Sequence, residues 1–324
     1  MSRAIELAAV VRGTTSPNPW VGAVLVTSGG ATFEGATERP GQRHAEIVAL
    51  DAARAAGVDP AGATLYTTLE PCSHHARTPP CADAVIAAAV ARVVVGIEDP
   101  DARVAGRGIE QLRAAGITVD VGVCAAEVRA QLAPYVKHRT TGRPWVLLKL
   151  AASLDGRTAA PDGTSKWISG PAARADAHRL RAESDAVIVG AGTVRADDPS
   201  LTVRDAGGDD PLRVVLGQAP EGARIHPCVE LGGELPDVLD ELGRRGIVQA
   251  MVEGGATVAG EFHRAGLVDR YVLYLAPALF GGDDGRPVFR GPGAATIDDV
   301  WRGRVMNVEQ LGDDLKVELE CSPG

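Results

Sequence analysis

The chain has 324 residues, and because a soluble domain contains roughly 100–200 residues, this length predicts two domains. Hydrophobic residues make up 45% and charged residues 23%, which is typical of a globular protein and excludes global disorder. The formal net charge of -9 is opposite in sign to the surface that nonspecific nucleic-acid binding requires, so we expect no nucleic-acid partner.

Cysteine usage and hydropathy predict the compartment. Five cysteines in a chain of this length are too few for a secreted disulfide framework. The N-terminal residues lack the long apolar core of a signal peptide, and no run approaches the roughly 18 apolar residues of a membrane span. We therefore expect a cytoplasmic protein with no membrane partner.

Hydrophobic periodicity predicts alternating helices and strands in the first half. Helices are expected over residues 5–11, 44–56, 81–89 and 109–115, and strands over 20–27, 63–69, 92–97 and 117–121. This alternation is typical of an α/β domain with a mostly parallel sheet covered by helices.

A polar stretch with Gly and Pro at 138–144 predicts a linker, which divides the chain into domains 1–143 and 144–324. In the second domain we expect strands over 145–151, 186–189, 212–216, 248–252 and 271–276, and helices over 172–183, 236–244 and 257–265. Two further β-like runs, 304–311 and 315–319, predict a closing hairpin.

Three potential metal ligands lie at the starts of predicted helices or just after a strand. His44 opens one helix, Cys72 follows a strand after Pro71, and Cys81 opens the next helix. One imidazole and two thiolates suit Zn²⁺, and three protein ligands leave a fourth position for water, as in catalytic zinc sites. The helix N-termini would help to keep the thiolates ionised.

Glu46, two residues after His44, is placed to move a proton between a zinc-activated water and a leaving amine, which is the chemistry of hydrolytic deamination. The H-A-E and P-C motifs resemble the zinc-deaminase signature, although eight residues separate Cys72 from Cys81 where that signature has two. Alternatively, the histidine and the two cysteines could occur at these positions by chance. His74 and His75, in the loop between the cysteines, are interpreted as loop or substrate-contact residues.

Residues 68–81 (TLEPCSHHARTPPC), Asn18-Pro19 with Val21-Gly22, and the VAGRG run ending at Gly108 resemble the deaminase half of RibD, a family of bifunctional riboflavin-biosynthesis enzymes. The resemblance implies zinc-dependent removal of the 2-amino group of 2,5-diamino-6-(5-phosphoribosylamino)pyrimidin-4-one. It also implies metal ligands at His44, Cys72 and Cys81, a proton shuttle at Glu46, and a hydrogen bond from Asn18 to the ring. Asn18 could instead be a turn residue between two prolines.

The second domain contains two candidate features. Lys149 lies in an apolar strand, so it has either a function or a solvent-facing orientation. Gly254-Gly255 joins a strand directly to a helix, whose free N–H groups could hold a phosphate, or the glycines could form a simple tight turn. Gly190 and Gly192 lack the third glycine of a dinucleotide fingerprint.

These features, together with SLDGR, SKWIS, TVRADDPSLTVR and VEGGAT, resemble the RibD reductase half. The resemblance implies a dihydrofolate-reductase-like fold and hydride transfer from NADPH to C1′ of the ribose, which gives a ribitylamino side chain. The residues implied to face NADPH are Ala151, Trp167, Thr193, Asp197, Gly255, Ala256, Thr257, Val258, Ala259 and Gly260. Those implied to face substrate are Lys149, Ser165, Arg181, Ser200, Arg204 and Glu253.

Plainer interpretations stay open for several of these side chains. Arg181 and Arg204 could be solvated surface charges, and Asp197 could cap a turn before Pro199. The run after Leu216 reads Gly217-Gln218, where many relatives have an Asp-Ser-like pair.

The sequence thus predicts a cytidine-deaminase-like α/β/α domain followed by a dihydrofolate-reductase-like α/β domain. We expect a bifunctional enzyme with Zn²⁺ and NADPH, a small phosphoribosyl pyrimidine as substrate, and a homodimer formed through the second domain. One alternative is a single-function zinc nucleobase deaminase whose C-terminal domain is a non-catalytic binding module. Another is a non-enzymatic protein with structural zinc.

Overall fold

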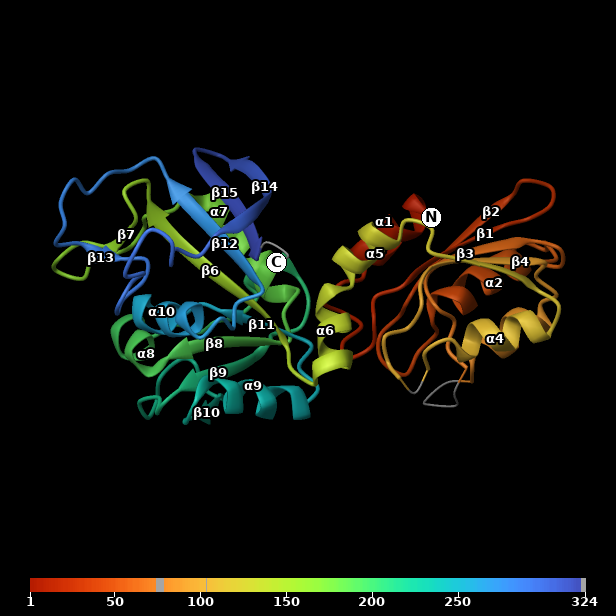
Figure 1. The fold of residues 1–324 in the computed structure, drawn as a ribbon, viewed down its shortest axis with the longest axis horizontal. Helices are drawn as coiled ribbons and strands as arrows, with labels where there is room; N and C mark the ends of the chain where they lie inside the picture. The colour runs from red at the N-terminus through yellow and green to blue at the C-terminus, as the bar shows by residue number, and fades with distance from the viewer. Residues whose placement is uncertain (74–78, 103, 322–324) are drawn as a thin grey trace. The chain divides into compact units, whose positions relative to one another are not determined.

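The computed structural model describes residues 1–73, 79–102 and 104–321. It separates into two compact units, Met1–Gly142 and Arg143–Gly324, each built around its own sheet (Figure 1). Within the described ranges, no helix has the length and apolar character needed to cross a membrane.

The first unit contains a five-stranded sheet in the order β2-β1-β3-β4-β5. Its strands are β1 (Gly22–Val26), β2 (Thr32–Ala36), β3 (Thr64–Leu69), β4 (Arg92–Ile97) and β5 (Thr118–Val121). Its helices are α1 (Ser2–Val10), α2 (Ala45–Ala55), α3 (Cys81–Ala87), α4 (Arg107–Ala114), α5 (Ala125–Gln131) and α6 (Ala133–Thr141).

The prediction of a mostly parallel sheet is wrong for this unit. β1 pairs antiparallel with both β2 and β3, whereas β3, β4 and β5 are parallel to one another. Strand β2 was not predicted, because most of its side chains are exposed or half-buried and its sequence, TFEGA, lacks a clear apolar alternation.

The polar stretch at 138–144, which was predicted as a linker, is helical as far as Thr141. Helix α6 continues to Thr141 and ends at Gly142, which adopts a left-handed conformation with φ of 76°. Glycine is favoured there because it has no Cβ to clash in that conformation. The polar side chains of the segment therefore belong to the last turns of a helix.

The second unit contains an eight-stranded sheet in the order β10-β9-β8-β11-β6-β12-β15-β14. These strands are β6 (Trp145–Ser153), β8 (Ala186–Gly190), β9 (Leu212–Leu216), β10 (Val229–Leu231), β11 (Gln249–Val252), β12 (Arg270–Ala276), β14 (Gly303–Leu311) and β15 (Asp314–Cys321). The helices are α7 (Pro171–Ala182), α8 (Ala191–Asp197), α9 (Leu235–Arg244) and α10 (Ala256–Arg264).

The strands from β10 to β12 in this order are parallel, and the closing hairpin β14–β15 adds two antiparallel strands at one edge. The predicted strands and the hairpin are all present. Helix α8 was not predicted, because its glycine-containing start resembles a loop, and neither was the small sheet of β7 (Arg157–Ala159) and β13 (Arg286–Pro287).

Alternate residues of β6 point into two cores on opposite faces of the sheet. Val146, Leu148 and Leu150 pack with residues of α9 and α10, whereas Leu147 packs with residues of α7 and α8. Lys149 is two residues after Leu147 on the strand, so its side chain lies on the same face of the sheet. This face, covered by α7 and α8, is called the α7 face below.

Candidate functional site

The three predicted metal ligands come together at one end of the first sheet. His44 precedes α2, Cys72 follows β3, and Cys81 is the first residue of α3. Their ligand atoms all lie within 4.8 Å of one another. The His44 Nδ1 atom is 3.6 Å from the Cys72 Sγ and 3.3 Å from the Cys81 Sγ.

These separations fit a tetrahedral zinc site. Ligand atoms around zinc lie roughly 3.5 Å apart, given Zn–S bonds of about 2.3 Å and Zn–N bonds of about 2.0 Å. A set of one imidazole and two thiolates is also chemically suited to Zn²⁺ and leaves one coordination position for a water. The donor set therefore fits the metal that the sequence predicts.

The two thiols differ in acidity. The neighbouring Cys81 thiol, and then His44, lower the pKa of Cys72 to about 4, and the Cys81 amide also donates a hydrogen bond to the Cys72 Sγ at 3.3 Å. The Cys72 thiolate and burial raise the pKa of Cys81. A divalent cation would supply the positive charge that allows both thiols to ionise together.

Glu46 lies in the first turn of α2 and is only 3% exposed. Burial raises its pKa to about 7, and the negative charge of Cys72 adds to this effect. A carboxyl group that gains and loses a proton near neutral pH is suited to general acid and base catalysis. It lies beside the candidate ligands, and its role as a proton shuttle stays a prediction.

Sequence reasoning missed Glu70, a buried carboxylate two residues before Cys72. Its oxygens accept four backbone N–H groups, from Asp99 at 3.1 Å, Gly106 at 2.9 Å, Gly108 at 2.8 Å and Ile109 at 3.2 Å. These bonds connect the end of β3 to the loop after β4 and to the start of α4. An acidic residue at the end of an apolar strand was the available signal.

The close approach of these segments explains the glycine at position 108. A Cβ atom there would lie 2.0 Å from the Pro71 carbonyl oxygen, so a larger residue would push α4 away from the segment that carries Cys72. Glu70 and Gly108 thus hold in place the segment that carries Cys72.

We expect Glu70→Gln to lower the free energy of unfolding of the first unit by about 2–3 kcal/mol, because charge-assisted hydrogen bonds to buried amides are lost. Zinc affinity should fall as well. Chemical denaturation and a zinc titration against a competing chelator would measure the two effects. The control is Glu110→Gln, a change at an exposed acidic residue of α4, and equal effects from both variants would contradict the prediction.

Asn18 is half-buried in a tight turn of the first unit. Its backbone N–H donates to the Thr15 carbonyl at 2.9 Å, and the Thr15 hydroxyl donates to the Asn18 carbonyl at 3.1 Å. The turn interpretation therefore describes its backbone, and the contact of its side chain with the ring stays a prediction. His74 and His75 lie outside the described residues.

In the second unit, three predicted substrate residues lie together. The Arg181 guanidinium binds both carboxylate oxygens of Glu253, at 2.7 and 3.0 Å, and the Lys149 Nζ lies 3.9 Å from the same carboxylate. Burial opposes ionisation of Glu253, but Arg181 and Lys149 hold its pKa below the usual value. Arg181 also donates to the Thr202 carbonyl at 2.6 Å, so it is a buried structural cation as well.

The glycine turn after β11 leads into α10. The Gly255 amide donates to the Thr193 hydroxyl at 3.1 Å, which brings two predicted cofactor residues together. In the same run Val258, Ala259 and Gly260 are buried, and the first two belong to the core. The exposed start of this run is Gly255 and Thr257, with Ala256 half-buried between them, and the cofactor contacts of all six residues stay predictions.

The other predicted residues differ in accessibility. Ala151, Ser165 and Ser200 are half-buried, whereas Trp167, Asp197 and Arg204 are exposed. The Trp167 side chain is 66% exposed, and the Arg174 guanidinium lies 4.7 Å from its ring centroid. Asp197 ends α8, and the following Asp198 binds Arg224, so this acidic pair also shapes the turn.

Two family models match the chain. The cytidine and deoxycytidylate deaminase zinc-binding region matches residues 1–97, and the RibD C-terminal domain matches residues 144–317. The chain is 40% identical to the riboflavin biosynthesis protein RibD of Escherichia coli K12, over 98% of each chain. It is 44% identical to RibD of Mycobacterium tuberculosis, over 98% of this chain and 96% of that protein.

Solved structures agree with these matches. Acinetobacter baumannii RibD superimposes with a TM-score of 0.92 at 38% identity, covering 99% of this chain and 98% of that one. A deaminase/reductase from Thermotoga maritima gives a TM-score of 0.90 at 37% identity, covering 99% and 97%. The predicted pair of folds, cytidine-deaminase-like and dihydrofolate-reductase-like, is confirmed.

The similarity extends over nearly the whole of this chain and of its relatives, and it includes both a deaminase zinc-binding region and a reductase domain. A deaminase followed by a non-catalytic binding module does not account for the second match. The chain belongs to the RibD family of bifunctional deaminase-reductases of riboflavin biosynthesis.

Proposed function

We propose that the first unit removes the 2-amino group of 2,5-diamino-6-(5-phosphoribosylamino)pyrimidin-4-one, and that the second unit then reduces the ribosyl group with NADPH to give 5-amino-6-(5-phosphoribitylamino)uracil. The observation that carries the first step is the group of His44, Cys72 and Cys81 within 4.8 Å, with buried Glu46 beside it. The Lys149, Arg181 and Glu253 cluster supports the second step.

In the deaminase unit, His44, Cys72 and Cys81 would hold zinc, which supplies Lewis acidity and makes water nucleophilic near neutral pH. Glu46 takes a proton from the attacking water and delivers it to the leaving amino group, so oxygen replaces nitrogen on the ring and ammonia departs. Asn18 orients the pyrimidine by a hydrogen bond.

In the reductase unit, NADPH would supply the hydride that reduces C1′ of the opened ribose. The free N–H groups at the start of α10, at Gly255–Thr257, suit a cofactor phosphate. A cavity of about 650 Å³ borders the last turn of α10 and the first turn of α9, with Gly217, Glu261 and Arg264 among its lining residues, and the adenosine part is proposed to extend toward it. Ala151, Trp167, Thr193 and Asp197 are the other proposed cofactor contacts.

The substrate phosphate carries negative charge, which Lys149 and Arg204 can offset, whereas Ser165 and Ser200 offer hydroxyl hydrogen bonds. Glu253 holds Lys149 by its charge, and Arg181 keeps that carboxylate ionised. In this proposal Arg181 supports the Glu253 carboxylate, whereas Lys149 and Arg204 contact the substrate.

Incubating the purified protein with the diaminopyrimidine substrate tests the proposal. Without a nicotinamide cofactor, mass spectrometry should find only the deaminated product, and with NADPH it should find the ribityl product. A third reaction with NADH measures cofactor preference. Deamination in every tube without reduction would contradict the reductase assignment, and no turnover by zinc-replete enzyme would contradict the substrate.

We place the enzyme in the cytosol, where its five cysteines would stay reduced, because all five are free thiols in the structure and two of them are the proposed metal ligands.

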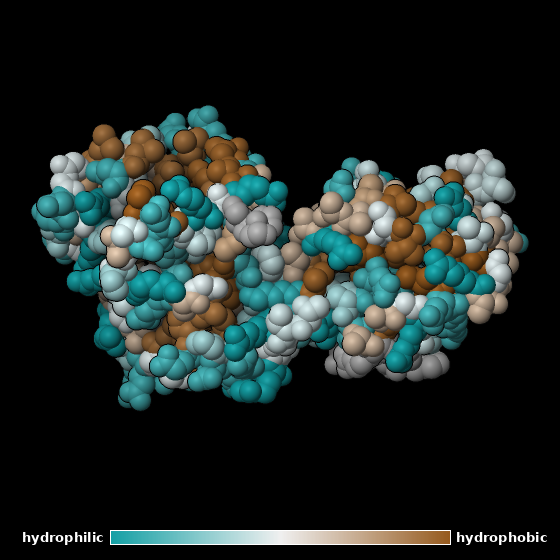
Figure 2. Space-filling model, in the orientation of Figure 1, coloured by the Kyte–Doolittle hydropathy of each residue, from teal (hydrophilic) through white to brown (hydrophobic). Residues whose placement is uncertain are grey.

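The expected homodimer would form at β14, the strand at one edge of the larger sheet. Val305, Met306 and Val308 on this strand are 56%, 38% and 58% exposed. Figure 2 shows apolar surface over the end of this unit where β14 and β15 lie.

An apolar edge strand is self-complementary across a two-fold axis, since the same strand of a second copy can pair with it. We expect Val308→Lys to convert a dimer into a monomer, as measured by light scattering after size exclusion. Val10→Lys, at an 81% exposed valine of the first unit, should leave the dimer intact. A parent enzyme that is monomeric at micromolar concentration would contradict this assignment.

A further inference from the structure

Tyr274 lies in the reductase unit directly beside the strand that carries Lys149. It is on β12, opposite Ala151 of β6, and its side chain is 1% exposed in the core on the α7 face. The Lys149 Nζ lies 5.9 Å from the centroid of the Tyr274 ring. Among the described residues, the ring and the Glu253 carboxylate, which lies 3.9 Å away, are the two groups that face the Lys149 ammonium.

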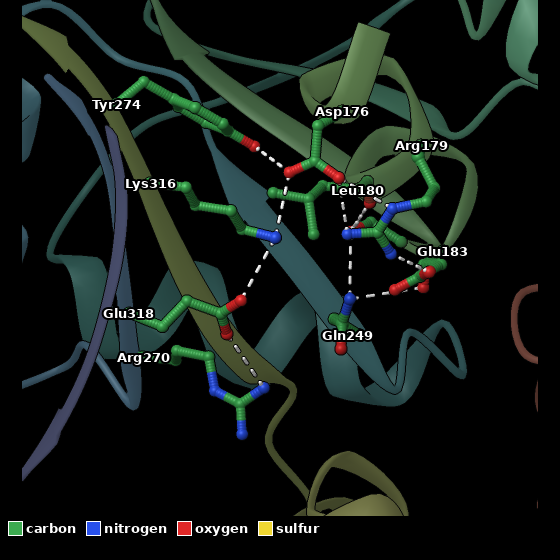
Figure 3. A network of polar contacts seen from close by, with 10 residues as sticks. Asp176, Arg179, Leu180, Glu183, Gln249, Arg270, Tyr274, Lys316 and Glu318 are labelled. Atoms are coloured by element: carbon green, nitrogen blue, oxygen red, sulfur yellow. Dashed lines mark hydrogen bonds and ion pairs between the residues drawn. The ribbon is translucent and has the colours of Figure 1, made fainter. Parts of the chain in front are cut away.

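The Tyr274 hydroxyl connects this ring to a buried polar network (Figure 3). It donates to the Asp176 Oδ2 on α7 at 2.7 Å. The same oxygen lies 2.9 Å from the Lys316 Nζ on β15, and Lys316 also lies 3.1 Å from Glu318. The Lys316 side chain is only 4% exposed, so this ion pair is shielded from solvent.

The charges in the network are fixed by these contacts. Burial opposes ionisation of Asp176, but Lys316, Tyr274 and Arg179 together hold its pKa below the usual value. Burial, and then the hydrogen bond to Asp176, raise the pKa of Tyr274, so the phenol remains a neutral donor. An anion that accepts a hydrogen bond from the phenol polarises the O–H bond, which makes the ring face more attractive to an ammonium group.

The Glu253 carboxylate alone holds Lys149 loosely. Both of its oxygens already accept close hydrogen bonds from Arg181, and Lys149 lies at the outer limit of an ion pair. A lysine side chain has several rotatable bonds, so a second contact is needed to select one position for its ammonium group. The oriented Tyr274 ring provides that contact from the neighbouring strand, β12.

We propose that Asp176, paired with Lys316, is a positioning residue of the reductase, which acts by orienting the Tyr274 ring against which Lys149 lies. This inference rests on the proposed role of Lys149 in the reduction. The rival explanation is that the network only fastens the C-terminal hairpin to α7, in which case its loss would lower stability and leave the reaction itself unchanged.

A double-mutant cycle separates the two explanations. Tyr274→Phe keeps the ring and removes the hydroxyl, and Lys149→Met removes the ammonium group. We expect Tyr274→Phe to lower the reductase kcat/KM for the pyrimidine roughly 5- to 20-fold. The KM for NADPH and the deaminase rate on the same chain should not change. In the Lys149→Met background, measured in single turnovers at high enzyme concentration, Tyr274→Phe should have no further effect.

Tyr271→Phe is the matched control. Tyr271 is on the same strand, is 4% exposed, and its hydroxyl forms a bond of the same length, 2.7 Å, with His263 on the other face of the sheet. Its loss should cost similar stability and leave the reductase kcat/KM unchanged. Asp176→Asn, which keeps an acceptor and removes the charge, should lower kcat/KM in the same direction as Tyr274→Phe, so the test does not depend on one variant folding.

Equal losses of kcat/KM in Tyr274→Phe and Tyr271→Phe would overturn the inference. So would an effect of Tyr274→Phe that persists undiminished in the Lys149→Met background. Full reductase activity of Lys149→Met would remove the proposed role of Lys149 and the inference with it, whereas parent enzyme that fails to reduce the substrate would refute the proposed function itself.

Discussion

Glu46→Gln should lower the deaminase rate by a factor of about 10² to 10⁴, the usual contribution of a positioned proton-transfer group. Glutamine keeps the volume of the buried side chain but cannot accept the proton of the attacking water. Because Glu46 is not one of the three grouped ligands, the zinc content should stay unchanged. Ammonia release and metal analysis would measure the two quantities.

The reductase provides an internal control for this variant. Supplied with the deaminated intermediate and NADPH, Glu46→Gln should reduce it at the parent rate, because the substitution lies in the other unit. Glu6→Gln, at a glutamate whose side chain is 64% exposed on α1, should affect neither activity. Parental deamination by zinc-loaded Glu46→Gln would support a structural metal instead.

Glu253→Gln should destabilise the second unit by about 3–5 kcal/mol and abolish its reductase activity. The substitution leaves Arg181 without its buried counter-ion, and removing one partner of a buried ion pair costs far more than the pair contributes. The Arg181 and Glu253 side chains are 9% and 11% exposed, so water cannot replace the lost carboxylate. Chemical denaturation would measure the loss, and deaminase activity should persist.

The chain offers a control with the same chemistry at the surface. Glu241 of α9 also binds two cations, Arg244 and Arg245, but it is 32% exposed and its partners are 69% and 42% exposed. Exposed ion pairs contribute about 0–1 kcal/mol, so Glu241→Gln should lower stability by no more than that. Similar losses in the two glutamine variants would show that burial does not govern the Glu253 cluster.

The candidate metal ligands could be predicted from sequence because each one lies at the end of a periodic element. Parallel strands such as β3 and β4 bring those ends to one edge of the sheet, so spacing along the chain translates into proximity. Glu70 belongs to the same edge, but its four partners are backbone amides, which no side-chain motif marks.

In the reductase unit the sequence was less informative for a different reason. Tyr274 has the pattern of an ordinary core residue and Asp176 that of a surface residue on an amphipathic helix, so neither attracts notice alone. Their contact with Lys316 depends on strand order, because β15 lies next to β12 only after the closing hairpin has formed. Likewise, the helical periodicity of α10 did not reveal that the Val258 side chain packs in the core.

The position of β15 in the sheet has a consequence for biosynthesis. It is translated after every other strand of the larger sheet, yet it pairs with β12 and supplies Lys316 to the network around Asp176 and Tyr274 (Figure 3). The first unit uses residues up to Gly142 alone and can fold while the rest of the chain is still on the ribosome. A nascent chain can therefore have a finished deaminase before its reductase sheet is complete, and deamination is also the first of the two proposed reactions.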